Sequence, residues 1–349
     1  MKKSALKARK DAAARLLLRK EAADTQAIVK GIIASDTAAL SRAITLVEST
    51  RPEDEIRAGE IVEACLKEAA SGIRVGITGV PGAGKSTFIE ALGLFLISRG
   101  HRVAILAVDP SSSLSKGSIL GDKTRMQELS RTPNAFIRPS PAGDSLGGVT
   151  RKTRESITLC EAAGFDVILV ETVGVGQSEV AVHGMVDFFL LLKIAGAGDE
   201  LQGIKRGIME MADAVVINKA DGPNLEAAKK AEGIFKSALH LYPPKDNGWT
   251  PPVMRCSSTE GSGIAEVWEM IDRYAASCHK DGSFETKRNT QNLHWLKQRI
   301  ESALTSNFYR DPEIQKAYEA YKTKVIRKEI TPGRAANALL ELYRPDQTS

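Results

Sequence analysis

The stretch that decides the fold is Gly79-Val80-Pro81-Gly82-Ala83-Gly84-Lys85-Ser86-Thr87. It fits the pattern GxxxxGKS/T, follows a β-branched run at residues 73–78 and precedes an apolar helical stretch. In this strand–loop–helix context, backbone N–H groups surround a phosphate and the helix N-terminus adds partial positive charge. An ordinary glycine-rich turn, the alternative, does not require such a context. The residues that we predict to bind nucleotide phosphates are Gly79, Pro81, Gly82, Ala83, Gly84, Lys85, Ser86 and Thr87.

Two side chains of this loop are candidates for catalysis and for metal binding. Lys85 is expected to reach the β and γ oxygens and to act as a catalytic residue, and Ser86 is expected to give its hydroxyl to Mg²⁺.

Short β-branched runs alternate with helical stretches after residue 73. The expected strands are residues 73–78, 103–108, 167–170, 188–192, 214–217 and 253–256. These runs are apolar on both faces, which indicates strands that are buried on both sides. We therefore predict an α/β fold, a mostly parallel P-loop sheet flanked by helices.

Helical extensions are expected on both sides of this sheet. We divide the chain into a basic helical or disordered arm (1–23), an N-terminal helical extension (24–70), a P-loop domain (71–280) and a C-terminal helical dimerisation arm (281–349). Asp36 or Thr37 can cap the first extension helix and Pro52 can open the next. In the C-terminal arm, a polar stretch at 281–291 precedes an apolar stripe of Leu293, Leu296, Ile300 and Leu304. Such stripes are more often intramolecular packing than a subunit interface.

The base of the nucleotide is indicated by Asn218-Lys219-Ala220-Asp221, which follows the expected strand 214–217 and fits the pattern NKxD. A carboxylate at Asp221 can accept hydrogen bonds from two guanine donors that adenine lacks, and Lys219 can lie along the base plane. A helix cap is the alternative for four residues alone. The pattern stands about 130 residues after the phosphate loop and is followed by Ser257, Ser258 and Thr259, so we predict GTP and GDP as ligands.

Acidic residues at the ends of other strands are candidate Mg²⁺ ligands. Glu171 follows the strand 167–170, Asp109 follows 103–108, and the ends of neighbouring parallel strands meet at one edge. Gly174 is expected to contact the γ-phosphate and Gln177 to act with Glu171 in catalysis. Asp122 is a third acidic candidate, and solvation at the surface explains it equally well.

Composition restricts the function classes. The chain has 349 residues and a formal net charge of +5, but its first twenty residues carry +7 and the other 329 carry −2. The net charge of −2 outside the first twenty residues argues against a basic surface that binds nucleic acid. No uncharged apolar run approaches the roughly 18 residues of a membrane span, so we expect a soluble protein without membrane contact. The four cysteines form no CxxC pair, which argues against a zinc site and against disulfides. We expect a cytoplasmic protein, or one of the mitochondrial matrix if the basic head is a presequence.

Taken together, the motifs resemble the MeaB/ArgK/MMAA family of GTPases. The segments that carry the resemblance are residues 79–87, 109–112, 121–126, 138–141, 171–179 and 195–205. The segments at Glu171 and Asp199 are the most specific, because generic P-loop proteins lack them.

The resemblance implies a SIMIBI-class GTPase that acts as a chaperone for a cobalamin-dependent acyl-CoA mutase, usually methylmalonyl-CoA mutase. Such proteins gate adenosylcobalamin loading from an adenosyltransferase and help to remove damaged cofactor. Family members are homodimers. Carried over by position, Ser86, Asp109, Asp122 and Glu171 match the magnesium surroundings, and Asp199 and Lys205 fall in a switch that signals to the mutase.

Several other functions remain as alternatives. A nickel-insertion GTPase would need a Cys/His cluster, a partition ATPase an additional early lysine, and a signal-recognition GTPase a Met-rich RNA-binding domain, and none of these features is found in the sequence. A kinase linked to amino-acid transport and a scaffold that binds GTP without turnover are the remaining alternatives.

Overall fold

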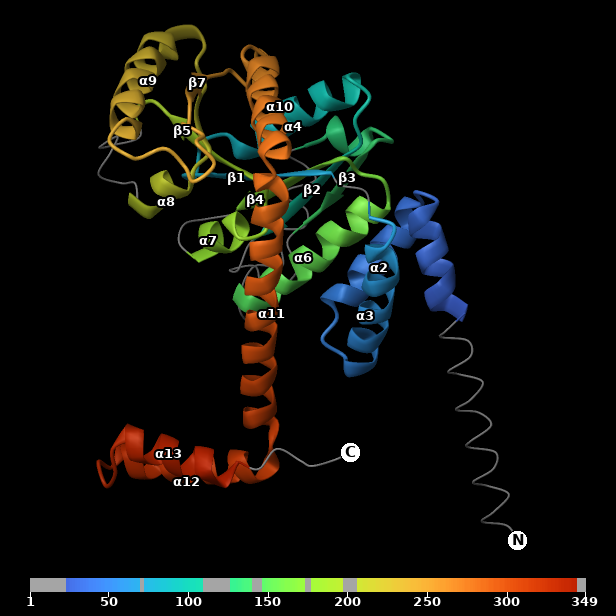
Figure 1. Cartoon of the computed structure of the whole chain (residues 1–349), viewed down its shortest axis with the longest axis vertical. Coiled ribbons are helices and arrows are strands. Elements are labelled where there is room, and N and C mark those ends of the chain that lie inside the picture. Colours follow the sequence, from blue (N-terminus) through green and yellow to red (C-terminus); the bar gives the residue numbers. More distant parts are fainter. Residues whose placement is uncertain are drawn as a thin grey trace. The chain divides into compact units, whose positions relative to one another are not determined.

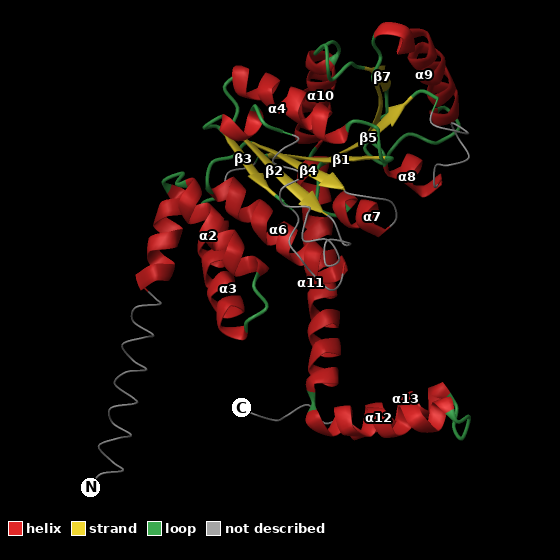
Figure 2. Ribbon diagram, turned by 180° about the vertical axis from the view of Figure 1, so that it is seen from behind, coloured by secondary structure: helices red, strands yellow, loops and turns green. Residues whose placement is uncertain are grey.

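The computed structural model describes residues 23–69, 72–108, 126–139, 146–172, 177–196 and 206–343. Its centre is a seven-stranded sheet with the strand order β3-β2-β4-β1-β5-β6-β7 (Figure 2). Each pair of neighbouring strands is parallel. The strands are β1 (Ile73–Gly79), β2 (Val103–Val108), β3 (Ala135–Arg138), β4 (Val167–Thr172), β5 (Phe188–Ile194), β6 (Ala214–Asn218) and β7 (Val253–Arg255). The carboxyl ends of these strands therefore meet at one edge of the sheet, and their amino ends meet at the other.

Helices connect the strands, and further helices precede β1 and follow β7 along the chain (Figure 1). A helix at residues 23–33 precedes the named elements. These are α2 (Thr37–Glu48), α3 (Pro52–Leu66), α4 (Lys85–Ser98), η1 (Leu129–Arg131), α6 (Leu146–Ala162), α7 (Gln177–His183), α8 (Arg206–Met211), η2 (Gly222–Asn224), α9 (Leu225–Leu239), α10 (Ile264–Asp281), α11 (Ser283–Arg310), α12 (Pro312–Ile326) and α13 (Pro332–Leu342).

The two faces of the sheet are covered by different helices. On one face, α4 and α10 bury Phe88 and Ile271 against residues such as Leu190. On the other, α6, α7 and the N-terminal helices share a core with alternate residues of β2 and β4, and α8 and α9 cover β6 and β7. Burial on both faces explains why these strands are continuous apolar runs.

The predicted parallel α/β fold is confirmed, and so are its N-terminal helix signals. The Asp36 side chain accepts a hydrogen bond from the Ala38 N–H and caps α2, and Pro52 opens α3. Two details differ from the prediction. Strand β3 was not expected, because this short edge strand buries only Phe136 below one-tenth exposure. Helix α11 begins at Ser283 inside the stretch expected to be a polar connection, because Phe284 is buried there in the core and the Ser283 N–H donates to Asp281.

The chain divides into two compact units, one ending at Lys287 and one beginning at Arg288. All four cysteines lie in the first unit as free, buried thiols. Within the described ranges, no helix combines the length and the apolar character that crossing a membrane requires.

Candidate nucleotide-binding site

The glycine-rich loop joins β1 to α4 at the carboxyl edge of the sheet. Gly84 caps α4 with a left-handed backbone (φ 84°), and a Cβ there would lie 2.7 Å from Nδ2 of Asn218. A Cβ at Gly79 would lie 2.3 Å from the carbonyl oxygen of Leu192 in β5. Both positions therefore require glycine. The loop ends at the N-terminus of a fourteen-residue helix, whose first N–H groups and dipole favour an anion.

Lys85 is held against this loop. Its Nζ donates to the carbonyl oxygen of Gly79 at 2.8 Å and to that of Val80 at 3.5 Å. Burial lowers the pKa of the Lys85 ammonium, and the charges of Glu171 and Glu179 act in the opposite direction. The cation is thus bonded to neutral carbonyls that a phosphate oxygen can replace as acceptors.

The first pair of predicted magnesium ligands comes together from two elements. Oγ of Ser86, in the first turn of α4, lies 3.5 Å from Oε1 of Glu171 near the end of β4. Glu171 is buried, at 4% exposure. Behind it, the Thr172 hydroxyl donates to the Thr78 hydroxyl at 2.9 Å and ties β4 to β1. A hydroxyl and a carboxylate are the hard oxygen donors that Mg²⁺ prefers, so these residues fit that ion.

Asn218 connects the phosphate loop with the loop after β7. Its Nδ2 donates to the carbonyl oxygen of Ala83 at 2.9 Å. Its Oδ1 accepts from the N–H and the hydroxyl of Ser258, at 3.2 and 2.7 Å. The side chain is almost fully buried. The NKxD residue therefore fixes the distance between the phosphate loop and the base-reading loops.

The base-reading residues are placed by the same two loops. The Ser257 hydroxyl donates to the Asp221 carboxylate, and the Ala220 N–H donates to the carbonyl oxygen of Cys256 at 3.0 Å. Lys219 is exposed and has a left-handed backbone (φ 57°), which turns the chain away from β6. Thr259 is also exposed. The structure thus gathers Asn218, Lys219, Asp221, Ser257 and Ser258 at one end of the sheet.

Sequence reasoning did not single out some residues of this site. Cys256 packs its thiol 3.5 Å from Oδ1 of Asn218, and burial raises its pKa to about 12, so it remains a neutral packing group. Thr78, which lies directly before the phosphate loop, was also missed as a site residue. Their position one step from a recognised motif is the signal that could have found them.

Other predicted site residues cannot be placed. Asp109, Asp122, Gly174, Asp199 and Lys205 lie outside the described residues. Gln177 begins α7, and its side chain is outside them as well.

The model of one protein family, described as Methylmalonyl Co-A mutase-associated GTPase MeaB, matches residues 40–313. The chain belongs to the MeaB family. Membership makes this protein a GTPase, with GTP and GDP as its nucleotides. The matched region contains the phosphate loop, the Ser86–Glu171 pair and the base-reading loops.

Relatives of this MeaB-family chain extend over most of its length. A Mycobacterium tuberculosis protein named "Probable GTPase" is 52% identical, over 88% of this chain and 91% of the relative. The "Methylmalonic aciduria type A homolog, mitochondrial" of Mus musculus is 45% identical, over 90% of this chain and 78% of the relative. A crystal structure titled as the LAO/AO transport system kinase superposes with a TM-score of 0.73 at 36% identity, covering 92% of this chain and 97% of that one.

Proposed function

We propose that the protein is a GTP-hydrolysing chaperone of a cobalamin-dependent acyl-CoA mutase, with methylmalonyl-CoA mutase as the client. In this role it gates adenosylcobalamin loading, in which an adenosyltransferase takes part, and protects or reactivates the mutase. The observation that carries the proposal is the match to the mutase-associated family, which spans both halves of the nucleotide site. The name of the mouse relative, which refers to methylmalonic aciduria, supports the same client.

The proposed chemistry uses the residues of the nucleotide site and two further acidic residues. Loop N–H groups and the Lys85 ammonium stabilise charge on the β and γ oxygens, and Asp221 selects guanine. Ser86 and Glu171 would hold Mg²⁺, with Asp109 and Asp122 as further ligands. When bound, Mg²⁺ supplies charge neutralisation on the transferred phosphoryl group.

We propose slow intrinsic hydrolysis that the mutase accelerates. Gln177 lies beyond the second glycine of the segment Gly174-Val175-Gly176, so it needs an ordered segment to position a water molecule. Asp199 and Lys205 are the proposed coupling residues, because neither is needed to hold the phosphates.

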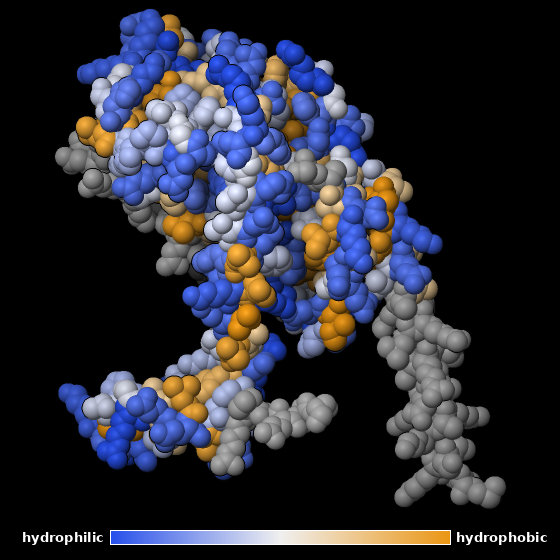
Figure 3. Space-filling view, in the orientation of Figure 1, coloured by the Kyte–Doolittle hydropathy of each residue, from blue (hydrophilic) through white to orange (hydrophobic). Residues whose placement is uncertain are grey.

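We also propose a homodimer formed through the C-terminal unit. Leu293, Leu296, Ile300 and Leu304 of α11 are 52–68% exposed and form one stripe, visible as the apolar surface of that helix (Figure 3). Within the same unit, a cavity of about 660 Å³ is lined mostly by apolar side chains, both aliphatic ones such as Leu339 and aromatic ones such as Phe308 and Tyr321. A second copy of this chain would cover such an apolar stripe.

The mutase proposal is tested by GTP hydrolysis with and without purified methylmalonyl-CoA mutase. We expect the mutase to raise the rate, and Asp199→Ala and Lys205→Ala to remove most of that rise while GTP affinity stays within about threefold. Asp272→Asn on the exposed face of α10 is the matched control. The mutase role fails if the unmutated protein is neither stimulated by nor co-purified with the mutase. The coupling role fails if stimulation persists in both variants.

One alternative has specific support, because a structural relative carries the name of a transport-system kinase. In that case the γ-phosphate would pass to a protein acceptor instead of to water. Radiolabelled γ-phosphate recovered on protein would favour the kinase, and its release as inorganic phosphate favours the GTPase.

A further inference from the structure

Two buried threonines lie beside the nucleotide site, at the carboxyl ends of β1 and β4. Thr78 directly precedes Gly79, the first residue of the phosphate loop, and Thr172 directly follows Glu171. The two threonines are 1% and 0% exposed, and the Thr172 hydroxyl donates to the Thr78 hydroxyl at 2.9 Å. We call Thr78 and Thr172 the hydroxyl pair. The pair is therefore one residue away from the phosphate loop and one residue away from the candidate magnesium ligand.

The hydroxyl pair lies where β1 and β4 separate. The backbone register of these two strands ends with Ile77 opposite Glu171. Beyond that point β1 continues beside β5, and β4 continues beside β2. The bond between the hydroxyls of Thr78 and Thr172 extends the link between β1 and β4 by one further residue. The strand that leads into the phosphate loop and the strand that carries Glu171 are thus still joined at the level of the site.

The pair and the magnesium ligand lie on opposite faces of the sheet. Side chains alternate along a strand, so Glu171 points to the face that α4 covers, where the Ser86 hydroxyl lies 3.5 Å away. Thr172 points to the other face, where Val170 and Val182 of α7 share an apolar core. In such surroundings a hydroxyl that loses its partner is not compensated by bulk water. The bond between the two threonines is therefore costly to break.

We propose that the hydroxyl pair positions Glu171 against Ser86 and thereby determines how tightly the site holds Mg²⁺. Ser86 is carried by the loop and helix that continue β1, whereas Glu171 is carried by β4. The pair fixes the separation of these strands at their carboxyl ends, so its loss changes the separation of the two oxygen ligands. Thr78 and Thr172 are positioning residues, because they act through Glu171 and Ser86.

The sensitivity of the site follows from the ion. Mg²⁺ requires near-ideal octahedral geometry with oxygen ligands at about 2.0 to 2.1 Å, so small displacements of a ligand weaken binding. Groups that orient metal ligands from behind typically change metal affinity by about 10 to 100-fold. The positioning role rests on the proposed Mg²⁺ site at Ser86 and Glu171.

The test replaces one or both threonines of the pair. Mg²⁺ is titrated into the full-length protein with bound GDP and followed by calorimetry, and urea unfolding without Mg²⁺ measures stability. Thr172→Val keeps the branched shape but leaves the Thr78 hydroxyl without its donor, so it should lower the urea midpoint and weaken Mg²⁺ binding at least about tenfold. Thr172→Ser keeps the hydroxyl and should bind Mg²⁺ within about twofold of the unmutated protein.

The double variant, Thr78→Val with Thr172→Val, separates positioning from stability. Two facing methyl groups leave no unpaired hydroxyl, so the urea midpoint should return close to that of the unmutated protein. Mg²⁺ binding should remain at least about tenfold weaker, because the link between the strands is still missing. Thr153→Val is the control, since Thr153 is also buried but its hydroxyl donates to the carbonyl oxygen of Val149 in the same helix, at 2.9 Å. It should keep the Mg²⁺ affinity of the unmutated protein.

The outcomes distinguish the pair from the site that it serves. Normal Mg²⁺ binding in Thr172→Val, or recovery of Mg²⁺ affinity together with stability in the double variant, would overturn the positioning role and leave the Mg²⁺ site intact. If the unmutated GDP complex binds no Mg²⁺, the proposed Mg²⁺ site itself is wrong, and the role of the pair with it. GDP affinity without Mg²⁺ should change less than about twofold in every variant, because the phosphate loop and Asp221 remain in place.

Discussion

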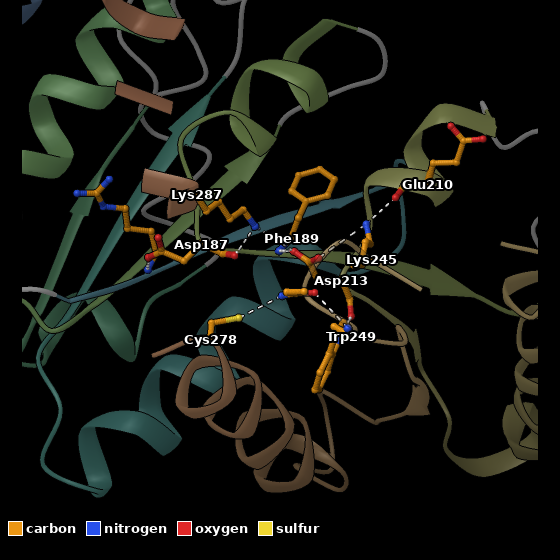
Figure 4. A network of polar contacts seen from close by, with 10 residues as sticks. Asp187, Phe189, Glu210, Asp213, Lys245, Trp249, Cys278 and Lys287 are labelled. Atoms are coloured by element: carbon orange, nitrogen blue, oxygen red, sulfur yellow. Dashed lines mark hydrogen bonds and ion pairs between the residues drawn. The ribbon is translucent and has the colours of Figure 1, made fainter. Parts of the chain in front are cut away.

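The two ends of the same parallel strands hold their polar groups in different ways. At the carboxyl end, Lys85 is bonded to neutral loop carbonyls, and Asn218 fixes one loop against another. At the amino end, Lys287 and Lys245 face Asp213, so cations and a carboxylate compensate one another (Figure 4).

The difference shows what each end can do. A cation whose acceptors are exchangeable carbonyls can give them up for phosphate at small cost. A buried carboxylate that loses an ammonium partner loses part of its charge compensation, which destabilises the fold. Changes at the carboxyl end should therefore affect ligand binding more than folding, and changes at the amino end should do the reverse.

The largest effect is expected from Lys85→Ala at the carboxyl end. Loss of the charge opposite the β and γ oxygens should lower GTP hydrolysis by about 10² to 10³-fold, or about 2.7 to 4 kcal/mol. The free energy of unfolding should change little, since only carbonyl contacts are lost. Single-turnover hydrolysis and urea unfolding measure the two quantities. Lys229→Ala on the exposed face of α9 is the control, and wild-type turnover in Lys85→Ala would contradict the assignment.

Asp221→Asn tests the base-reading half of the carboxyl end. An amide nitrogen would face a guanine donor where a carboxylate oxygen accepted before, so GTP should bind about 2 to 4 kcal/mol more weakly, with relaxed preference toward xanthine nucleotides. Titration calorimetry with guanine, xanthine and adenine nucleotides measures this change. Equal affinity of the unmutated protein for ATP and GTP would refute guanine selection by this loop.

His183 tests the amino end through pH. Its pKa is about 4 in the folded protein, because of burial first and of Lys287 next, against about 6.5 when unfolded. The unfolded chain therefore binds the proton first as the pH falls. This contribution to stability is fully present above about pH 6.5 and is lost toward pH 4, by up to about 3 kcal/mol.

Urea unfolding at several pH values between 4.5 and 7.5 measures this loss. We expect a flatter stability profile in His183→Gln than in the unmutated protein. His240→Gln, at an exposed position after α9, should leave the profile unchanged. If stability depends on pH in the same way in His183→Gln and in the unmutated protein, the pKa of His183 is not lowered by folding.

The smallest effect is expected at Gly282, the residue between α10 and α11. Gly282→Ala should cost about 1 kcal/mol of unfolding free energy, since alanine strains the left-handed backbone although its Cβ meets nothing. Gly59→Ala, in the middle of α3 with open space around it, should instead stabilise by up to about 1 kcal/mol. Thermal unfolding measures the change in melting temperature of both variants. Equal changes would show that alanine is not strained at position 282.

The residues at the carboxyl end could be predicted from the sequence, whereas those at the amino end could not. At the carboxyl end, fixed spacings such as that between Gly79 and Lys85 follow from the shape of a phosphate, so they can be read locally. Every described strand except β3 was found, because burial on both faces makes runs such as residues 188–192 apolar. The nucleotide class followed from Asp221, whose chemistry matches guanine and not adenine.

The amino end has no such local pattern. Asp187, Asp213, Lys245 and Lys287 are far apart in the sequence, and only the strand order brings them together. A lone aspartate before a strand is indistinguishable from a solvated turn residue. The early start of α11 was hidden for a related reason, because one buried residue, Phe284, anchors an otherwise polar turn.

The outer strands of the sheet have a consequence for how copies of this chain can meet. Strand β3 has four residues and β7 has three, and both end in an arginine with a glutamate partner, Arg138 with Glu48 and Arg255 with Glu232. Pro251 and Pro252 directly precede β7 and cannot donate hydrogen bonds. Short, charged edges of this kind disfavour the strand-to-strand pairing that begins aggregation. A crowded solution of this protein is therefore protected against open-ended sheet growth, and association is directed to helical surfaces.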